Sequence, residues 1–340
     1  METFPFSIFA KGSANLGFHN YLCNLCGKIF KKLLKMSLLA VGTVAFDAIE
    51  TPLDKIDKVV GGSATYICLT ASHFINQLQL VSVVGDDFPE SMINEFKNRD
   101  IDTEGLEVIE GEKSFFWSGR YHDDMNGRDT LVTDLNVLAG FDPKVPQAYR
   151  NADYLMLGNI DPTLQMKVIE QMDKRPKLIM LDTMNFWMDL TWDALTDVLK
   201  HIDILTINDE EAKQLSGEHS LKKAAKKILA EMGPKHLIIK KGEHGALLFH
   251  NDGMFFCPAM PLEVVFDPTG AGDSFAGGFL GWLAKTNDLS FDNMKRAVVY
   301  GSAMASFCVE AFGPNRLLEI NQQNIDNRIQ QFIKMMDISM

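Results

Sequence analysis

Residues 265–278, which read VFDPTGAGDSFAGG, constrain the fold of this chain more than any other stretch. Apolar residues just before the turn favour a strand, and apolar residues after it recur every three or four positions, as along one face of a helix. The pattern therefore predicts a strand that passes through a Pro-Thr-Gly turn directly into a helix. The strand-forming residues are Leu262, Val264, Val265 and Phe266.

The predicted helix begins at a glycine-rich turn that contains Gly270, Ala271 and Gly272. A helix N-terminus has free N–H groups and the positive end of the helix dipole, so it favours an anion, most often a phosphate. Glycine lets the backbone come close to that anion. The next residue, Asp273, is either a first-turn acid stabilised by the dipole or a general base beside a transferring phosphoryl group. The length of the string favours the base.

The string resembles the signature of the ribokinase-like (PfkB-type) carbohydrate kinases, which use ATP to phosphorylate a hydroxyl of a sugar or nucleoside. The resemblance implies that Gly270, Ala271 and Gly272 form an anion hole beside Thr269 and the nucleotide, and that Asp273 is the base. It implies ATP and Mg²⁺ as cofactors and leaves a requirement for a monovalent cation such as K⁺ open. The Walker pattern is missing, so this glycine motif has no built-in lysine.

Composition limits the partners. A formal net charge of -12 argues against nucleic acid or an anionic membrane as the main partner, because both are bound through basic surface. No apolar run approaches the roughly 20 residues that cross a bilayer. The cysteines are five, scattered and without a secretory leader, which predicts reduced thiols and a cytoplasmic location.

Residues 1–35 differ from the rest of the chain, because they hold a single acid, Glu2, against five lysines. The Cys23–Cys26 spacing suits a metal or redox site, but no second pair completes one. The segment is a basic arm, a targeting segment, or sequence upstream of a true start at Met36. We favour the last and treat 1–35 as an N-terminal extension, untranslated or disordered, before one kinase domain at 36–340.

From Met36 onward, predicted strands alternate with predicted helices, which indicates a three-layer αβα sandwich around a mainly parallel sheet. Residues 106–109, 113–122 and 129–133 instead alternate as antiparallel strands do. We predict a small β-strand lid formed by about 49–60 and 111–134, as in the family that the chain resembles. A homodimer through this lid is left open.

Three further motifs follow predicted strands. Asn208 and Glu211 form either a helix N-cap or, by resemblance, the site that holds the Mg²⁺–phosphate through water. Lys241 and Gly242 belong to a turn between two strands, and the family has a turn here that borders the nucleotide. The segment 182–187, with Asn185, is similar to a family substrate motif, but it has one extra residue before the Asn and no Arg close behind.

The predicted substrate motif lies near the start of the kinase domain. Asp47 follows the first strand, and Gly61 and Gly62 precede a helix that Ser63 is expected to cap. By resemblance, Asp47 accepts hydrogen bonds from sugar hydroxyls and the glycine pair lets the sugar lie against the backbone. With Asn185, these four residues are the predicted substrate contacts.

The sequence thus predicts an ATP-dependent kinase that phosphorylates a hydroxyl of a small sugar. A nucleoside kinase of the same family (adenosine- or inosine-like) and a non-catalytic nucleotide sensor with the same fold are the alternatives. A dinucleotide-binding oxidoreductase is disfavoured, because no Gly-Xaa-Gly-Xaa-Xaa-Gly follows the first strand.

Overall fold

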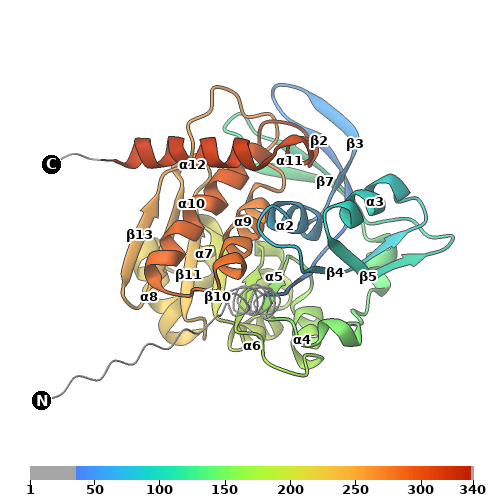
Figure 1. Ribbon diagram of the computed structural model, residues 1–340, viewed down its shortest axis with the longest axis horizontal. Coiled ribbons are helices and arrows are strands. Elements are labelled where there is room, and N and C mark those ends of the chain that lie inside the picture. Colours follow the sequence, from blue (N-terminus) through green and yellow to red (C-terminus); the bar gives the residue numbers. More distant parts are fainter. Residues whose placement is uncertain (1–35, 338–340) are drawn as a thin grey trace, which may run out of the picture. The chain divides into compact units, whose positions relative to one another are not determined.

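The computed structural model describes residues 36–337, coloured by sequence in Figure 1. The expected extension at 1–35, with its Cys23–Cys26 pair, lies outside the described residues. Among the described residues, no helix is both long enough and apolar enough to cross a membrane.

A nine-stranded sheet forms the centre of this part of the chain, in the order β13-β12-β11-β10-β9-β8-β1-β4-β5. Every neighbouring pair from β11 to β5 is parallel, while β12 and β13 are antiparallel at one edge. The predicted mainly parallel sheet is therefore confirmed. The strands are β1 (Leu38–Val41), β4 (Leu78–Gly85), β5 (Ile101–Ile109), β8 (Tyr154–Leu157), β9 (Leu178–Asp182), β10 (Ile204–Asn208), β11 (His236–Lys240), β12 (Ala246–His250) and β13 (Gly253–Cys257).

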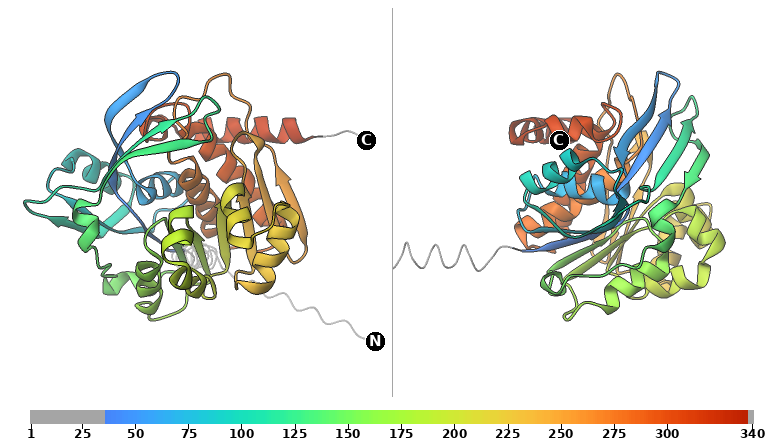
Figure 2. Two further views of the ribbon diagram at one scale, coloured as in Figure 1. Left: turned by 180° about the vertical axis from the view of Figure 1, so that it is seen from behind. Right: turned by 90° about the vertical axis from the view of Figure 1, so that its right-hand side faces the viewer.

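Helices cover both faces of this sheet, which the side view in Figure 2 shows as two outer layers. The alternation within β1 shows why: Leu38 and Ala40 pack into one apolar core, and Leu39 and Val41 pack into the other. One layer contains α2 (Ser63–Ala71), α3 (Glu90–Asn98), α9 (Ala271–Thr286), α10 (Phe291–Cys308), α11 (Asn315–Glu319) and α12 (Gln322–Met336). The other contains α4 (Pro162–Glu170), α5 (Asn185–Leu190), α6 (Trp192–Leu199), α7 (Asp209–Ser216) and α8 (Leu221–Glu231).

A second, four-stranded sheet has the order β3-β2-β6-β7 and extends beyond one edge of the sandwich (Figure 2). Its strands are β2 (Ala45–Glu50), β3 (Lys55–Gly61), β6 (Phe116–Tyr121) and β7 (Arg128–Asp134). Because β2 begins four residues after β1 ends, the small sheet starts at the carboxyl edge of the large one. The β2–β6 pair is parallel, whereas β2–β3 and β6–β7 are antiparallel. Short 3₁₀ turns complete the chain: Asn136–Gly140, Gln147–Tyr149 and Gly242–His244.

Three expectations about local structure were wrong. Residues 262–266 form no strand; prolines flank the stretch, and Val264 and Phe266 are exposed, so no neighbouring strand or core holds it extended. Residues 106–109 belong to β5, which pairs parallel with β4 in the large sheet. The third error concerns α2, whose N-cap is Gly62 rather than Ser63, because Gly62 has a non-helical φ of 92° and the helix begins at Ser63. In addition, the edge strand β13 was not predicted.

Candidate active site

Three polar residues end neighbouring strands of the large sheet. Asp182 ends β9, Asn208 ends β10 and Lys240 ends β11, and Asn208 is the register partner of Lys240. The carboxyl ends of parallel strands meet at one edge, which is where open α/β sheets bind ligands. The candidate site therefore lies at this edge.

The predicted anion hole forms the beginning of α9. Gly270 is the N-cap residue with a φ of 77°, a left-handed conformation that favours glycine, and a side chain there would overlap the Tyr66 ring. Asp267 holds the preceding loop in place, since its carboxylate accepts from the backbone N–H of Thr269 at 2.8 Å and of Gly313 at 2.9 Å. The Ala271 N–H makes a long bond of 3.2 Å to the Pro268 carbonyl. The other first-turn N–H groups of α9 have no intrahelical acceptor, so they can bind an anion.

Asp273 lies in the first turn of α9, at the N-terminus where the free N–H groups are. Burial raises the pKa of its carboxyl group to about 7, and the nearby Asp182 adds to the rise, while Lys240 and Arg128 oppose it. A general base works best when its pKa is close to the working pH. The position and the pKa of Asp273 thus both suit proton transfer beside a phosphate.

Asn208 and Glu211 form a capping box at the start of α7. The Glu211 carboxylate accepts from the Asn208 N–H at 2.7 Å, and the Asn208 side-chain oxygen accepts from the Glu211 N–H at 2.8 Å. The predicted helix cap is therefore present. Burial, and then Asp182, raise the pKa of Glu211 to about 7.

The buried acids at this edge of the sheet are suited to hold Mg²⁺ through water. Asp182, Glu211 and Asp273 are three carboxylates at one buried edge. The negative charge of Asp182 raises the pKa of both Glu211 and Asp273. A divalent cation would relieve that repulsion, and oxygen ligands with retained waters are what Mg²⁺ prefers. Within residues 36–337, no cluster of three or more His, Cys, Asp or Glu forms a ready metal cage.

Lys240 was not singled out from the sequence, which pointed to Lys241 instead. Its Nζ lies 2.6 Å from Asp182 Oδ2, and a Cβ built on Gly272 would be 2.9 Å from the same Nζ. Lys240 ends β11 and lies on the same face as Ile238, which packs into the core that contains α9, whereas Lys241 lies in the turn that follows the strand. Only the register of β11 decides between them. The backbone of Lys241 instead donates to Gly245 at 2.8 Å across the predicted turn.

Asp47 lies at the other end of the site, on β2, and is buried. Its carboxylate occupies the space that a side chain on Gly61 would need, so this glycine makes room for the acid. Burial raises the pKa of Asp47 to about 8, and Asp267 and Asp273 add to the rise, while the Gly62 N–H lowers it. Ser63 is buried, and its hydroxyl accepts from the Thr43 N–H at 3.1 Å.

The face of the small sheet that carries Asp47 also carries aromatic and basic side chains. Trp117 is the register partner of Asp47, so both side chains lie on one face of the sheet. Tyr121, four residues further along β6, contacts the anion-hole loop through its hydroxyl, 3.0 Å from Thr269 Oγ1. Arg128 lies over the Trp117 ring at 5.7 Å and lowers the pKa of Asp47, Glu211 and Asp273.

The two lid arginines therefore differ. Arg120 is paired with Glu50 at 2.8 and 3.2 Å on the exposed surface, whereas the charge of Arg128 acts on the buried acids. The tip of the lid also reaches the nucleotide turn, because Asn126 fills the space next to the α-carbon of Gly242. The small sheet thus touches both Thr269 and Gly242, as a lid over the site would.

Asn185, the remaining predicted substrate contact, is the first residue of α5. Its amide donates to the Gln214 side chain on α7. Trp187 instead reaches back toward the end of β8, where its Nε1 donates to Asn159 Oδ1 at 2.8 Å. A role for Asn185 in substrate binding stays a prediction.

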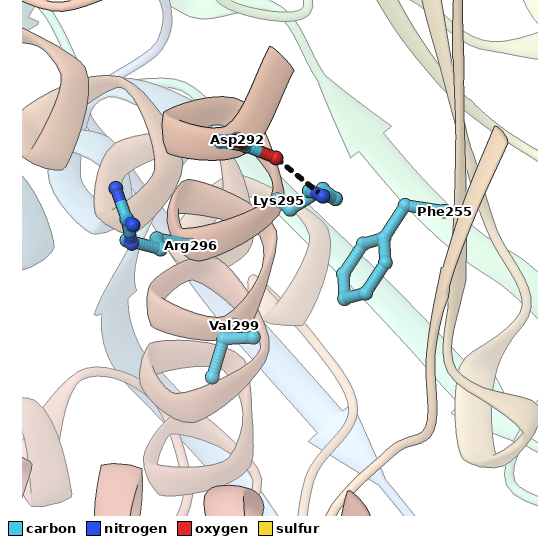
Figure 3. Close-up of a pocket in the computed structure, with 5 residues that line it drawn as sticks. All are labelled: Phe255, Asp292, Lys295, Arg296 and Val299. Atoms are coloured by element: carbon cyan, nitrogen blue, oxygen red, sulfur yellow. Dashed lines mark ion pairs between the residues drawn. The ribbon is translucent and has the colours of Figure 1, made fainter. Parts of the chain in front are cut away.

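A separate hollow of about 440 Å³ lies between β13 and the first half of α10 (Figure 3). An Asp292–Lys295 ion pair, Arg296, Phe255 and Val299 line it, and none of the predicted site residues does. It is therefore distinct from the cluster at the carboxyl edge.

Comparison with known proteins adds independent findings. The family model "pfkB family carbohydrate kinase" matches residues 35–321. A cytidine kinase from Thermococcus kodakarensis is 28% identical over 258 residues, which are 75% of this chain and 91% of that protein. A 2-dehydro-3-deoxygluconokinase from Thermoproteus tenax is 28% identical over 276 residues, 77% of this chain and 83% of the relative. The crystal structure of a nucleoside kinase from Methanocaldococcus jannaschii is similar in fold, with a TM-score of 0.69 and 22% identity over 87% of this chain and 99% of that one.

Proposed function

The chain belongs to the pfkB family of carbohydrate kinases and is an ATP-dependent kinase, and from that premise we propose that it phosphorylates a hydroxyl of an uncharged sugar. The single observation that carries the proposal is the placement of Asp273. It is a buried carboxylate with a pKa near neutrality, in the first turn of a helix whose N-terminus suits a phosphate. A non-catalytic sensor would have no use for such a base.

In this reaction the acceptor hydroxyl attacks the γ-phosphorus of ATP as its proton passes to the Asp273 carboxylate. The bond between the γ-phosphorus and the β–γ bridging oxygen breaks, and ADP leaves with that oxygen. The N–H groups of Gly270, Ala271 and Gly272 stabilise charge on the transferring group. In this proposed complex, Thr269, Gly242 and the adjacent Lys241 border the nucleotide.

Glu211 and Asn208 are the residues that would hold Mg²⁺ through water, where the ion would neutralise phosphate charge. Their capping box leaves the other Glu211 carboxylate oxygen and a second lone pair on Asn208 Oδ1 to accept hydrogen bonds from such waters. A requirement for K⁺ is a finer part of the proposal. Replacing K⁺ with Na⁺ in the assay at constant ionic strength measures it.

The charge at the substrate end supports an uncharged acceptor. Asp47 lies among Asp267 and Asp273, and these acids raise its pKa. A phosphorylated sugar would bring a second dianion next to these acids, which would repel it. Arg128 is the lid cation whose charge acts on Asp47, and it would have to offset that repulsion. Asp47, Gly61, Gly62 and Ser63 instead offer hydrogen bonds to neutral hydroxyls, and Asn185 on α5 is a further predicted contact.

A nucleoside is the second candidate, and Trp117 favours it. The indole lies on the same face of the lid as Asp47, so a base could stack on it while the ribose hydroxyls reach the acid. Arg128 over the ring adds a hydrogen-bond donor at that place. The cytidine kinase and nucleoside kinases among the relatives agree with this candidate.

A panel of acceptors tests the proposal. We expect ATP-dependent ADP release with free hexoses and pentoses or with cytidine, inosine and adenosine, at kcat/KM values far above that for fructose 6-phosphate. The highest kcat/KM with a phosphorylated sugar would contradict the argument from Asp47. A higher kcat/KM with nucleosides than with free sugars would decide for the second candidate.

Two further parts of the proposal concern the oligomeric state and the location in the cell. The edge strand β7 exposes Leu131 and Val132, so a homodimer through the lid would cover apolar surface. Sedimentation of the wild type and of a Leu131→Lys/Val132→Lys variant measures the dimer. The cytoplasmic location stays a prediction, which fractionation of the source cell would test.

A further inference from the structure

Lys240 lies where the predicted glycine motif lacks a cation of its own. Its ammonium group is 2.6 Å from Asp182 and stands beside Gly272 in the first turn of α9. Both side chains of the ion pair are largely buried, with exposed fractions of 17% for Lys240 and 8% for Asp182. The cation is thus held between the end of β9 and the anion hole.

An ammonium group has three donors, and Asp182 accounts for one of them. Lysine binds phosphate as a compact point charge, and it needs only one free donor to do so. Lys240 also has a wider electrostatic reach, because its charge lowers the pKa of Asp182, Glu211 and Asp273. It is therefore the cation common to the acids around the phosphate site.

Stability alone does not account for this pair. Taking two charges out of water costs about as much as their attraction returns, so a buried ion pair is weak evidence for a stabilising role. The chain offers a comparison at the other end of β11, where Lys235 pairs with Asp203 at 2.9 Å. That lysine is 64% exposed, and Asp203, which directly precedes the neighbouring strand β10, also pairs with Arg175.

Resting on the proposed function, we propose that Lys240 is a catalytic residue that donates to a γ-phosphoryl oxygen of ATP at the α9 N-terminus, with Asp182 as the residue that positions it. The ammonium group stabilises the charge on the transferring phosphoryl group while Asp273 takes the acceptor's proton. No bond to Lys240 forms or breaks, and its own protons stay in place. The lysine that a phosphate clamp needs is then supplied from a distant strand.

The test compares two matched lysine variants. Lys240→Gln should lower kcat by about 10²–10³-fold, the cost of removing one such donor. It should weaken binding of a non-hydrolysable ATP analogue about tenfold relative to ADP, which lacks the γ-phosphate. Lys235→Gln removes a lysine from the far end of the same strand and should leave both quantities within about twofold of wild type.

A double variant guards against misfolding. Lys240→Gln/Asp182→Asn removes both buried charges together, so it should fold, with a circular dichroism spectrum like that of the wild type. We expect it to show the same loss of kcat and of preference for the ATP analogue. A folded double variant with kcat and analogue-to-ADP affinity ratio within about twofold of wild type would overturn the proposal and leave a structural ion pair.

The readouts separate the two proposals. If the wild type phosphorylates no acceptor in the panel, the proposed function fails, but the ratio of analogue to ADP affinity still tests the contact of Lys240. If the wild type is an active kinase and the ratio is unchanged in Lys240→Gln, only the role of Lys240 fails.

Discussion

The two ends of the candidate site contain buried carboxylates in opposite surroundings. Asp273, at the phosphate end, lies among strand ends of the large sheet, with Lys240 and Arg128 to offset its neighbour Asp182. Asp47, on the small sheet, has the acids Asp267 and Asp273 as its strongest charged neighbours. Charge is thus partly compensated at the first end and largely uncompensated at the second.

The difference teaches what each acid is suited for. A base must be ionised to act, and the cations near Asp273 favour its ionised form. A carboxyl group that binds hydroxyls can work with a higher pKa, because a protonated acid still donates and accepts hydrogen bonds. The four predictions below test this contrast, in order of decreasing effect.

The largest effect is expected from Asp273→Asn, which keeps the shape of the side chain and removes its ability to accept a proton. The kcat should fall by about 10²–10⁴-fold, while the Kd for ATP measured by calorimetry should change little. In the wild type, kcat/KM should fall as the pH drops through about 7, because the base becomes protonated. Turnover at the wild-type rate in a folded variant would remove Asp273 from the mechanism.

Asp47→Asn should separate substrate binding from stability. The KM for the acceptor should rise by about tenfold or more, since one partner of its hydroxyls is weakened. The folded-state pKa of Asp47 is raised to about 8, so the stability it contributes is complete near pH 4 and is lost as the pH rises through 8. The variant should therefore melt a few degrees above the wild type at pH 8.5.

The same argument sets the control for Asp47→Asn. Near pH 4 the carboxyl group is protonated in the folded protein, so the melting temperatures of the two proteins should converge. A difference in melting temperature that stays constant from pH 4 to pH 8.5 would mean that charge burial at Asp47 is not its cause.

Glu211→Gln tests whether the phosphate end also handles the metal. The amide can still accept from the Asn208 N–H, so α7 should keep its cap. The Mg²⁺ concentration for half-maximal rate should rise several-fold, with about the same KM for the acceptor. An unchanged Mg²⁺ dependence would leave Glu211 as a helix cap alone.

The smallest effect is expected from Tyr121→Phe, which removes the hydroxyl contact between the lid and Thr269. One exchanged hydrogen bond is worth about 1 kcal/mol, so the KM for the acceptor should rise by a factor of about five at most. A loss of kcat as large as that of Asp273→Asn would show that lid and phosphate end act as one unit, against the contrast drawn here.

The regular part of the fold followed from the chain's periodicity. Strands such as β1 and β8 are short apolar runs buried on both faces, and helices such as α9 show apolar residues at helical spacing, so both were predictable. The pattern failed where local sequence is ambiguous. Residues 262–266 are as apolar as a strand but have no strand to pair with, and β5 alternates like a hairpin strand yet lies in the parallel sheet.

The candidate site divides in the same way. The glycine turn, Asp273 and the Asn208–Glu211 capping box are each contained in a few consecutive residues, whose local geometry their own types determine. The sequence by itself therefore determined the α/β architecture and these local motifs. Asp182, Lys240 and Arg128 come from three distant strand ends. Only the tertiary structure decided that they meet, because strand register and sheet order, set by packing across the whole core, select Lys240 over Lys241 and Arg128 over Arg120.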